Sequence, residues 1–317
     1  MTMEPNDLQR LLGPVLASVS RSFYLSIRLL PKSVRPAVSL AYLLARTSDT
    51  VADAPATGSE SDIDILSRYR EDISAGVLRP QTNNLLKATR TDHPGEQSLL
   101  HYAPLTFELL QKLPPDERER VVDVLSKIIS GQILDRTRFP DPQRLSFLKN
   151  PNELEEYTYL VAGCVGEFWT DIVHLRHAKS PATTERRRQA RMFGQALQLI
   201  NILRDAAADL AIGRCYFPET ELQHSNIQAD ANFIKHPAFL TIHRAWSLKA
   251  REWLKCATPY VNATPSYRLR LAAWMPAALG HSTLDLLDAQ STVPMTKVKV
   301  SRATVYQQLL AGLVRCL

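Results

Sequence analysis

Cysteine is scarce in this sequence of 317 residues, and its four copies lie far apart. No Cys-x-x-Cys pair occurs, so the sequence gives no sign of a disulfide framework or of a cysteine-bound zinc. A reducing compartment fits this pattern. The positions are Cys164, Cys215, Cys256 and Cys316.

Long apolar runs are also missing. No stretch approaches the ~18–20 apolar residues of a membrane-spanning helix. The first thirty residues include Glu4 and Asp7 and have no continuous apolar core, so we expect no signal peptide. Neither GxGxxG nor a P-loop motif is present, which argues against a Rossmann or P-loop nucleotide site. We expect a cytoplasmic protein without a transmembrane segment.

Strand patterns are nearly absent as well. The sequence shows no sustained alternation of polar and apolar residues and no Asn-Gly or Asp-Gly hairpin signal. Prolines instead separate about ten to twelve segments of helical period. With 45% apolar and 22% charged residues, the composition is that of a globular protein. We predict an all-α fold, with one domain over residues 1–317.

A polar stripe runs along the apolar segment Gly194–Pro218, which is predicted to form one long helix ending near Gly213. At about 100° per residue, the stripe residues fall within roughly 40° of the Asp205 direction. Two carboxylates and an amide are costly to bury unless a positive group meets them. The stripe consists of Gly194, Gln198, Asn201, Asp205 and Asp209.

The segment Arg35–Asp53 repeats this pattern. Its helix carries Tyr42, Arg46, Asp49 and Asp53 on one face, at spacings of four, three and four residues. Two such helices facing each other would form a cage of four carboxylates able to hold two or three Mg²⁺ ions. The alternative is that each Asp pair lies on an ordinary solvated face.

Other segments add candidates for binding an anion. Ser20, Arg21 and Ser22 offer two hydroxyls and a guanidinium at a predicted helix start, which suits phosphate. Arg214 follows the second Asp pair and could reach a metal-bound phosphate. The basic segment Lys297–Arg302 (KVKVSR) is predicted to be a strand or a flap. A net charge of +6 suits an anionic partner, either nucleic acid, a membrane surface or a phosphorylated substrate.

The helix predicted over Glu153–Arg176 contains Gly163 and Gly166. Glycine inside a helix costs roughly 1 kcal/mol against alanine, so we expect a close approach by another backbone or a ligand, or a kink. Tyr157 lies on the preceding turn, where its hydroxyl could exchange a proton in an apolar pocket or serve only as a core tyrosine. Asp135 and Arg136 are expected to form a surface pair.

Carboxylate-bound Mg²⁺, several arginines and apolar walls suit the ionisation of an allylic diphosphate. The residues that lead to this interpretation resemble those of the squalene/phytoene synthase family. The resemblance extends over nearly the whole chain. It is carried by SRSF at Ser20–Phe23, YLLARTSDTVAD at Tyr42–Asp53, EYTYLVAGCVG at Glu156–Gly166 and ALQLINILRDAAADLAIGRCYFP at Ala196–Pro218.

The resemblance implies an isoprenoid synthase fold with a central apolar cavity, and it assigns roles to the candidate residues. Tyr157 would assist proton removal or stabilise a cation, and Tyr42 and Gln198 would lie near the reacting carbons. The sequence departs from the family pattern at Ala52 and Ala208, where an acidic residue commonly precedes the last Asp. The implied metal ligands are Asp49, Asp53, Asn201, Asp205 and Asp209. The implied diphosphate contacts are Ser20, Arg21, Ser22, Arg46 and Arg214.

The resemblance also implies a head-to-head condensation of two farnesyl diphosphates. The DTVAD motif and the KVKVSR segment favour the squalene branch, which reduces its intermediate with NADPH. Phytoene, dehydrosqualene or presqualene diphosphate synthesis is the alternative, and a non-catalytic helical partner subunit is a more distant one. We expect a monomer or homodimer with no nucleic-acid partner, whose charge permits peripheral contact with the inner membrane surface.

Overall fold

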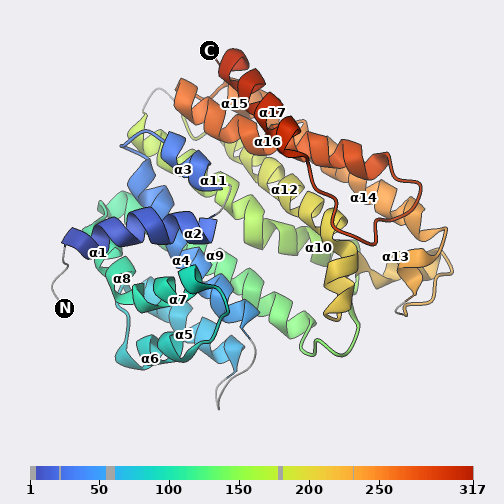
Figure 1. The fold of residues 1–317 in the computed structure, drawn as a ribbon, viewed down its shortest axis with the longest axis horizontal. Helices are drawn as coiled ribbons and strands as arrows, with labels where there is room; N and C mark the ends of the chain where they lie inside the picture. Colours follow the sequence, from blue (N-terminus) through green and yellow to red (C-terminus); the bar gives the residue numbers. More distant parts are fainter. Residues whose placement is uncertain (1–4, 21–22, 55–60, 178–180, 231, 317) are drawn as a thin grey trace. The chain divides into compact units, whose positions relative to one another are not determined.

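The computed structural model describes residues 5–20, 23–54, 61–177, 181–230 and 232–316 (Figure 1). Over these ranges the chain forms seventeen α-helices and two short strands, so the predicted all-α class is confirmed. The helices outnumber the ten to twelve predicted because proline opens many short ones. Pro80, Pro94 and Pro151, for example, each begin a helix. The first helical position tolerates proline because its N–H would have no partner within the helix.

The chain divides into two compact units. One comprises Met1–Arg136 with Asp171–Lys179, and the other comprises Thr137–Thr170 with Ser180–Leu317. The prediction of a single domain over residues 1–317 stays a prediction beside this division.

The first unit is built around helix α4 (Arg35–Asp53), which has the predicted bounds. It packs against five other helices of this unit, α2, α3, α5, α7 and α8. Its apolar side has fully buried leucines at Leu43 and Leu44. The other helices are α1 (Pro5–Arg10), α2 (Leu16–Ser20), α3 (Phe23–Leu29), α5 (Asp62–Ala75), α6 (Pro80–Ala88), α7 (Pro94–His101), α8 (Ala103–Lys112) and α9 (Pro115–Arg138), with a π-helical turn at Leu11–Val15.

The expected surface pair of Asp135 and Arg136 near the end of α9 is wrong. Asp135 is buried. Arg136 forms an ion pair with Asp62 at the start of α5. Adjacent residues on a helix point in directions about 100° apart, so one can face the core while its neighbour reaches another helix.

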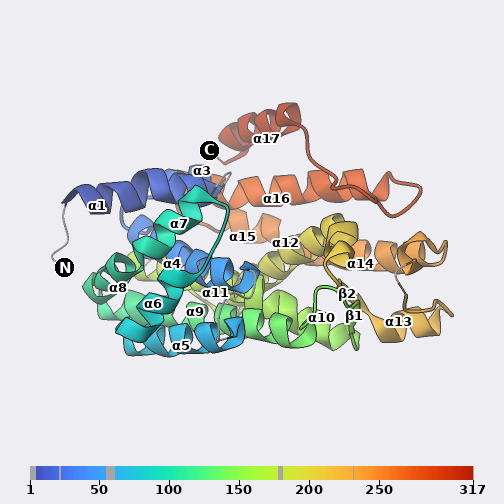
Figure 2. The ribbon, with the colours of Figure 1, turned by 60° about the horizontal axis from the view of Figure 1, so that its bottom comes forward.

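The second unit is organised around α12 (Thr184–Ala211), which packs against α10, α14, α15, α16 and strand β2. Figure 2 shows α12, α14 and α16 as long neighbouring helices. The elements around α12 are β1 (Ser146–Leu148), α10 (Pro151–Thr158), a π-helical turn at Tyr159–Gly163, α11 (Cys164–Arg176), β2 (Arg214–Pro218), α13 (Glu219–His224), a 3-10 turn at Phe233–Lys235, α14 (Phe239–Leu254), α15 (Ala257–Asn262), α16 (Tyr267–Asp288) and α17 (Arg302–Arg315).

Both ends of α12 have a local cause. The Thr183 side chain accepts a hydrogen bond from the Arg186 backbone N–H and caps the first turn. Gly213 has φ +75°, a left-handed conformation that glycine adopts without a steric penalty. The helix therefore stops at Ala211, close to its predicted end near Gly213, and Arg214–Pro218 forms β2.

The glycines of the α10–α11 region allow the close backbone approach that the sequence predicts. A Cβ on Gly166 would overlap the Ala190 carbonyl of α12, and one on Gly194 would overlap the Ala162 carbonyl. The absence of these side chains lets α12 lie directly against the π-helical turn and α11. This contact fixes α12 relative to the π-helical turn that follows α10, the helix that carries Tyr157.

The two strands pair in parallel, with Ser146 opposite Arg214 and Phe147 opposite Cys215. Sequence alone missed both strands because three and five residues are too short for a clear alternation. Lys297–Arg302 is not a strand either, because it is irregular up to Ser301, where α17 is capped. No helix in the described ranges is both long and apolar enough to span a bilayer.

Candidate functional site

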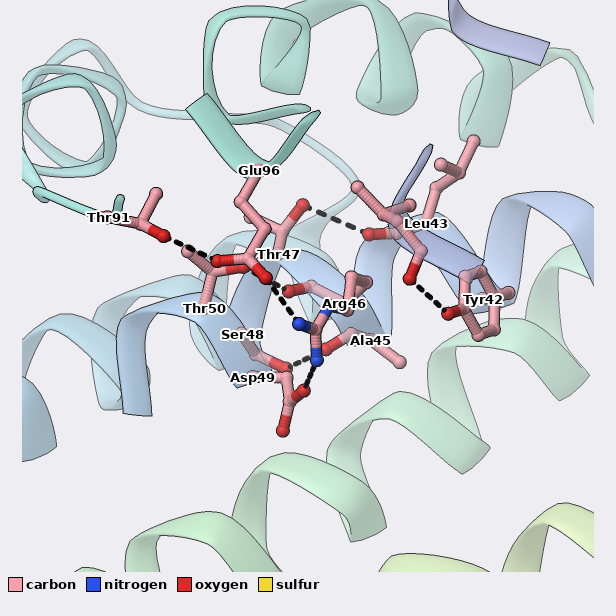
Figure 3. A network of polar contacts seen from close by, with 11 residues as sticks. Tyr42, Leu43, Ala45, Arg46, Thr47, Ser48, Asp49, Thr50, Thr91 and Glu96 are labelled. Atoms are coloured by element: carbon pink, nitrogen blue, oxygen red, sulfur yellow. Dashed lines mark hydrogen bonds and ion pairs between the residues drawn. The ribbon is translucent and has the colours of Figure 1, made fainter. Parts of the chain in front are cut away.

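The first acidic motif lies on the polar face of α4, where Arg46 is held between two carboxylates (Figure 3). Its two terminal nitrogens donate to Asp49, one turn further along α4, and to Glu96 in the first turn of α7. Glu96 also accepts a hydrogen bond of 2.6 Å from the Thr91 hydroxyl. Arg46 is thus oriented from both sides.

Neighbouring charges in this motif shift the pKa values of Asp49 and Arg46. Desolvation and then repulsion from the neighbouring Asp53 carboxylate raise the pKa of Asp49 above its ordinary value, although Arg46 opposes the rise. Burial lowers the pKa of Arg46, but Asp49 and Glu96 outweigh it and raise that pKa overall. A carboxyl group whose pKa is raised by a neighbouring carboxylate lies where a cation is stabilising.

The predicted neighbours of this motif are only partly described. The Tyr42 hydroxyl donates a hydrogen bond of 2.9 Å to the Val19 carbonyl. Ser20 is buried at the end of α2, where its hydroxyl donates to the Leu16 carbonyl. Arg21 and Ser22 lie outside the described residues. A diphosphate contact by Ser20 would therefore require its hydroxyl to leave the Leu16 carbonyl.

The second acidic motif lies along α12, and its stripe residues Gln198, Asn201, Asp205 and Asp209 are all half-buried. Most of the apolar residues between them are buried, among them Leu199 and Ile202. The predicted polar stripe on an otherwise apolar helix is therefore confirmed.

Asp205 accepts hydrogen bonds from two basic side chains. Arg204 binds both carboxylate oxygens, through Nε at 2.8 Å and Nη2 at 2.6 Å. Lys297 donates to Oδ2 at 2.9 Å. Burial would raise the pKa of Asp205, but the two cations outweigh it and hold that pKa below its ordinary value. The basic segment Lys297–Arg302 therefore contacts the second acidic motif through Lys297.

A small pocket lies just past the end of α12. Asp209, Arg214 and Tyr216 line it together with apolar groups that include Ile202 and Ala206. β2 starts at Arg214 and places this side chain beside the last turn of α12. The structure thus brings Asp209 and Arg214 to the same pocket, as their proposed roles require.

Tyr157 on α10 meets Tyr216 on β2. Their rings stack with centroids 4.9 Å apart and an angle of 21° between planes. The Tyr216 hydroxyl donates to the Tyr157 hydroxyl over a long 3.4 Å. Phe139 packs its edge against Tyr216. Tyr157 is half-buried, and both its ring and its hydroxyl contact Tyr216.

Four residues of these sites were not singled out as contacts in the sequence: Glu96, Arg204, Tyr216 and Lys297. Glu96 follows Pro94 closely, and proline with an early glutamate is typical of a helix start. Tyr216 lies on β2, a strand that the sequence analysis did not predict. The partnership of Lys297 with Asp205 spans 92 residues, and no local pattern indicates it.

The donor atoms fit a hard divalent cation. Asp49 and Asp53 in the first unit, and Asn201, Asp205 and Asp209 in the second, offer only oxygen ligands, which Mg²⁺ prefers. Among the residues described, no three His, Cys, Asp or Glu side chains come close enough to hold a metal alone. Substrate phosphate and water would complete the coordination. The four-carboxylate cage stays a prediction.

Known proteins are similar to this chain over most of its length. A family model described as squalene/phytoene synthase matches residues 16–304. The bifunctional lycopene cyclase/phytoene synthase of Colletotrichum graminicola is 30% identical over 73% of this chain, which covers 38% of the fungal protein. The squalene synthase of Yarrowia lipolytica is 27% identical over 98% of this chain and 68% of the yeast enzyme. The presqualene diphosphate synthase of Zymomonas mobilis is 26% identical over 93% of this chain and 90% of that protein.

The chain thus spans well under half of the fungal bifunctional protein and about two thirds of the yeast enzyme. Solved structures agree on the fold. A TcSQS structure aligns with a TM-score of 0.76 at 20% identity, covering 98% of this chain and 91% of its own. The squalene synthase HpnC of Alicyclobacillus acidocaldarius aligns with a TM-score of 0.65 at 17% identity, over 91% of this chain and 97% of HpnC. The predicted isoprenoid synthase fold is confirmed. This chain belongs to the squalene/phytoene synthase family of head-to-head prenyltransferases.

Proposed function

We propose that this protein joins two molecules of farnesyl diphosphate head to head, through presqualene diphosphate, and reduces the intermediate with NADPH to squalene. The observation that carries the proposal is the pair of polar stripes on α4 and α12. Each presents two aspartates one turn apart on a helix that also carries many buried apolar residues. Such stripes suit the departure of a diphosphate from an apolar allyl group.

The acidic residues and Asn201 of the two stripes would bind metal, and nearby arginines and serines would bind diphosphate. Asp49 and Asp53 on α4, with Asn201, Asp205 and Asp209 on α12, would hold Mg²⁺. When bound, Mg²⁺ would neutralise the charge that develops on the leaving pyrophosphate. Arg46 and Arg214 would contact phosphate oxygens, together with Ser20, Arg21 and Ser22.

Arg46 is held ready for this role. Asp49 and Glu96 fix two of its terminal nitrogens, so little side-chain entropy would be lost when it meets a phosphate. Arg214 at the pocket beside Asp209 would contact diphosphate from the second motif.

Tyr157 would act on the hydrocarbon rather than on the diphosphate. In the first half-reaction, the allyl cation of one substrate is attacked by the C2–C3 double bond of the other. A proton leaves as the cyclopropane closes. The Tyr157 hydroxyl, in its aromatic surrounding beside Tyr216, would help remove this proton or stabilise the cation. Tyr42 and Gln198 would lie near the reacting carbons.

Two features support the squalene branch. The first motif has the form DTVAD, and the basic segment Lys297–Arg302 places Lys297 at the second motif, where it could meet a phosphate of NADPH. The second candidate is an enzyme that stops at presqualene diphosphate, or that forms dehydrosqualene or phytoene without reduction. The presqualene diphosphate synthase of Zymomonas mobilis, matched over 90% of its length, favours this candidate. All four cysteines are free, which supports a cytoplasmic, reducing location.

A product assay tests the proposal. Purified protein is given farnesyl diphosphate and Mg²⁺, with and without NADPH, and the extract is analysed by gas chromatography and mass spectrometry. Squalene formed only with NADPH is the expected result. Presqualene diphosphate or dehydrosqualene as the sole product under both conditions would place the enzyme in the second group. No turnover, with geranylgeranyl diphosphate as well, would favour the non-catalytic homologue.

A further inference from the structure

The outer face of helix α17 (Arg302–Arg315) carries an exposed apolar stripe. Tyr306, Leu310, Leu313 and Val314 are 65%, 64%, 38% and 75% exposed. At about 100° per residue, these four positions fall within roughly 100° of one another around the helix. Single exposed apolar residues are ordinary, but a contiguous group marks a binding surface. We call these four residues the α17 stripe.

The opposite face of α17 lies against α16. Gly312 and Cys316 are buried, and Gly312 lies so close to Trp274 of α16 that a Cβ would overlap the indole ring. The Arg315 guanidinium lies 5.1 Å from the centroid of the same ring. The helix therefore already has its partner, and the α17 stripe points away from it.

Every charged side chain that follows Asp288 in the sequence is basic. No Asp or Glu follows Asp288, whereas Lys297, Lys299, Arg302 and Arg315 do. Lys299, Arg302 and Arg315 are exposed. Arg302 begins the helix one turn before Tyr306, on the same side. An apolar stripe bordered by basic residues is the pattern of a helix that lies in a lipid headgroup layer.

We propose that the α17 stripe docks the protein on an anionic lipid bilayer, with Tyr306, Leu310 and Val314 entering the headgroup boundary. Lys299 and Arg302 contact the acidic headgroups. Charge complementarity favours this occupant over a second copy of the chain, because pairing two α17 stripes would bring like charges together. The proposal does not depend on which prenyl product the enzyme makes.

Vesicle co-sedimentation tests the docking. The full chain is mixed with vesicles of phosphatidylcholine alone or with about 30% phosphatidylglycerol, and the pelleted fraction is measured against lipid concentration. We expect binding to the anionic vesicles only, weakened by 0.5 M salt because each basic residue near the surface contributes about fivefold. The double variant Leu310→Gln, Val314→Gln should bind at least about tenfold more weakly.

The matched control is Leu248→Gln on α14, where a leucine 67% exposed lies outside the α17 stripe. It should bind vesicles like the unchanged protein. Circular dichroism and pyrophosphate release in lipid-free buffer, unchanged in all variants, would exclude a folding defect. Equal vesicle binding by the double variant and the control, or no binding by the unchanged protein, would overturn the proposal. A dimer that the double variant abolishes, without vesicle binding, would identify a second copy as the occupant instead.

Discussion

Lys297 donates a hydrogen bond of 2.9 Å to the Asp205 carboxylate, across 92 residues of sequence. Asp205 is also held by Arg204 through two hydrogen bonds. A carboxylate that is to bind a cation therefore already has two cationic partners within the protein. Lys297 is on an irregular segment, whereas Arg204 is fixed on the same helix as Asp205, so Lys297 is the partner that can leave.

Replacing Lys297 by methionine should strengthen Mg²⁺ binding in the absence of substrate. The lysine competes with the metal for the same oxygen, and a partly exposed ion pair of this kind is worth about a two- to fivefold change in affinity. Isothermal titration calorimetry measures the dissociation constant. Lys299→Met, two residues further along the segment, is the control and should leave it unchanged. Weaker Mg²⁺ binding by Lys297→Met would contradict the competition.

Asp49→Ala and Asp205→Ala should each lower pyrophosphate release from farnesyl diphosphate by about 10²–10³-fold or more, because each removes a ligand that acts on the leaving group. Circular dichroism should show an intact fold. Asp123→Ala is the control, since Asp123 is an exposed aspartate of α9 that, among the described residues, forms a local ion pair with Lys127. If either site variant keeps full activity, its motif does not hold the catalytic metal.

Tyr157→Phe should lower kcat by about 100-fold, with a much smaller change in KM, because a hydroxyl that moves a proton acts in the transition state. Tyr216→Phe should give a milder loss, because it keeps the ring stacking but removes the donor to Tyr157. Tyr102→Phe provides a matched control, since that hydroxyl contacts Asp7 over the same 3.4 Å. Steady-state kinetics measure kcat and KM for each variant, and an unchanged kcat in Tyr157→Phe would show that Tyr157 takes no part in the chemistry.

His243 should make stability depend on pH. Its Nε2 donates to the Leu203 carbonyl at 3.1 Å. Burial lowers the pKa of His243 below 6.5, and the charge of Arg244 lowers it further. The hydrogen bond to Leu203 and the charge of Asp288 oppose this shift without reversing it. The unfolded chain then binds a proton before the folded one does. The free energy of unfolding should therefore fall as pH drops from 6.5 toward the folded pKa, by up to about 1.4 kcal/mol per pH unit.

Urea unfolding at several pH values measures this effect. His243→Gln should unfold with a smaller dependence on pH between 5 and 7 than the unchanged protein, because its side chain does not titrate. A pH dependence identical in the two proteins would show that His243 is not its source.

Long amphipathic helices were the part of the fold that could be predicted. The bounds of α4 match the expected Arg35–Asp53, because this helix has many turns of consistent apolar period. The strand Arg214–Pro218 could not be predicted, since it depends on pairing with Ser146–Leu148 far away in the sequence. Short elements owe their structure to tertiary partners rather than to local pattern.

The candidate site could likewise be predicted only where it depends on local helical spacing. Helical spacing placed Asp205 and Asp209 on one half-buried stripe and Arg46 beside Asp49. Spacing could not show that Glu96 completes the Arg46 contact or that Lys297 reaches Asp205. These partners come from other helices or loops, and a single sequence holds no periodic signal for a contact between distant segments.

The amount of pyrophosphate released per farnesyl diphosphate consumed tests the central claim most directly. Joining two substrates releases one pyrophosphate and a proton and leaves presqualene diphosphate. Hydride from NADPH then replaces the second pyrophosphate and gives squalene. The account predicts one pyrophosphate per farnesyl diphosphate with NADPH, and half as much without it. A ratio that stays at one half when NADPH is present would contradict the reductive branch.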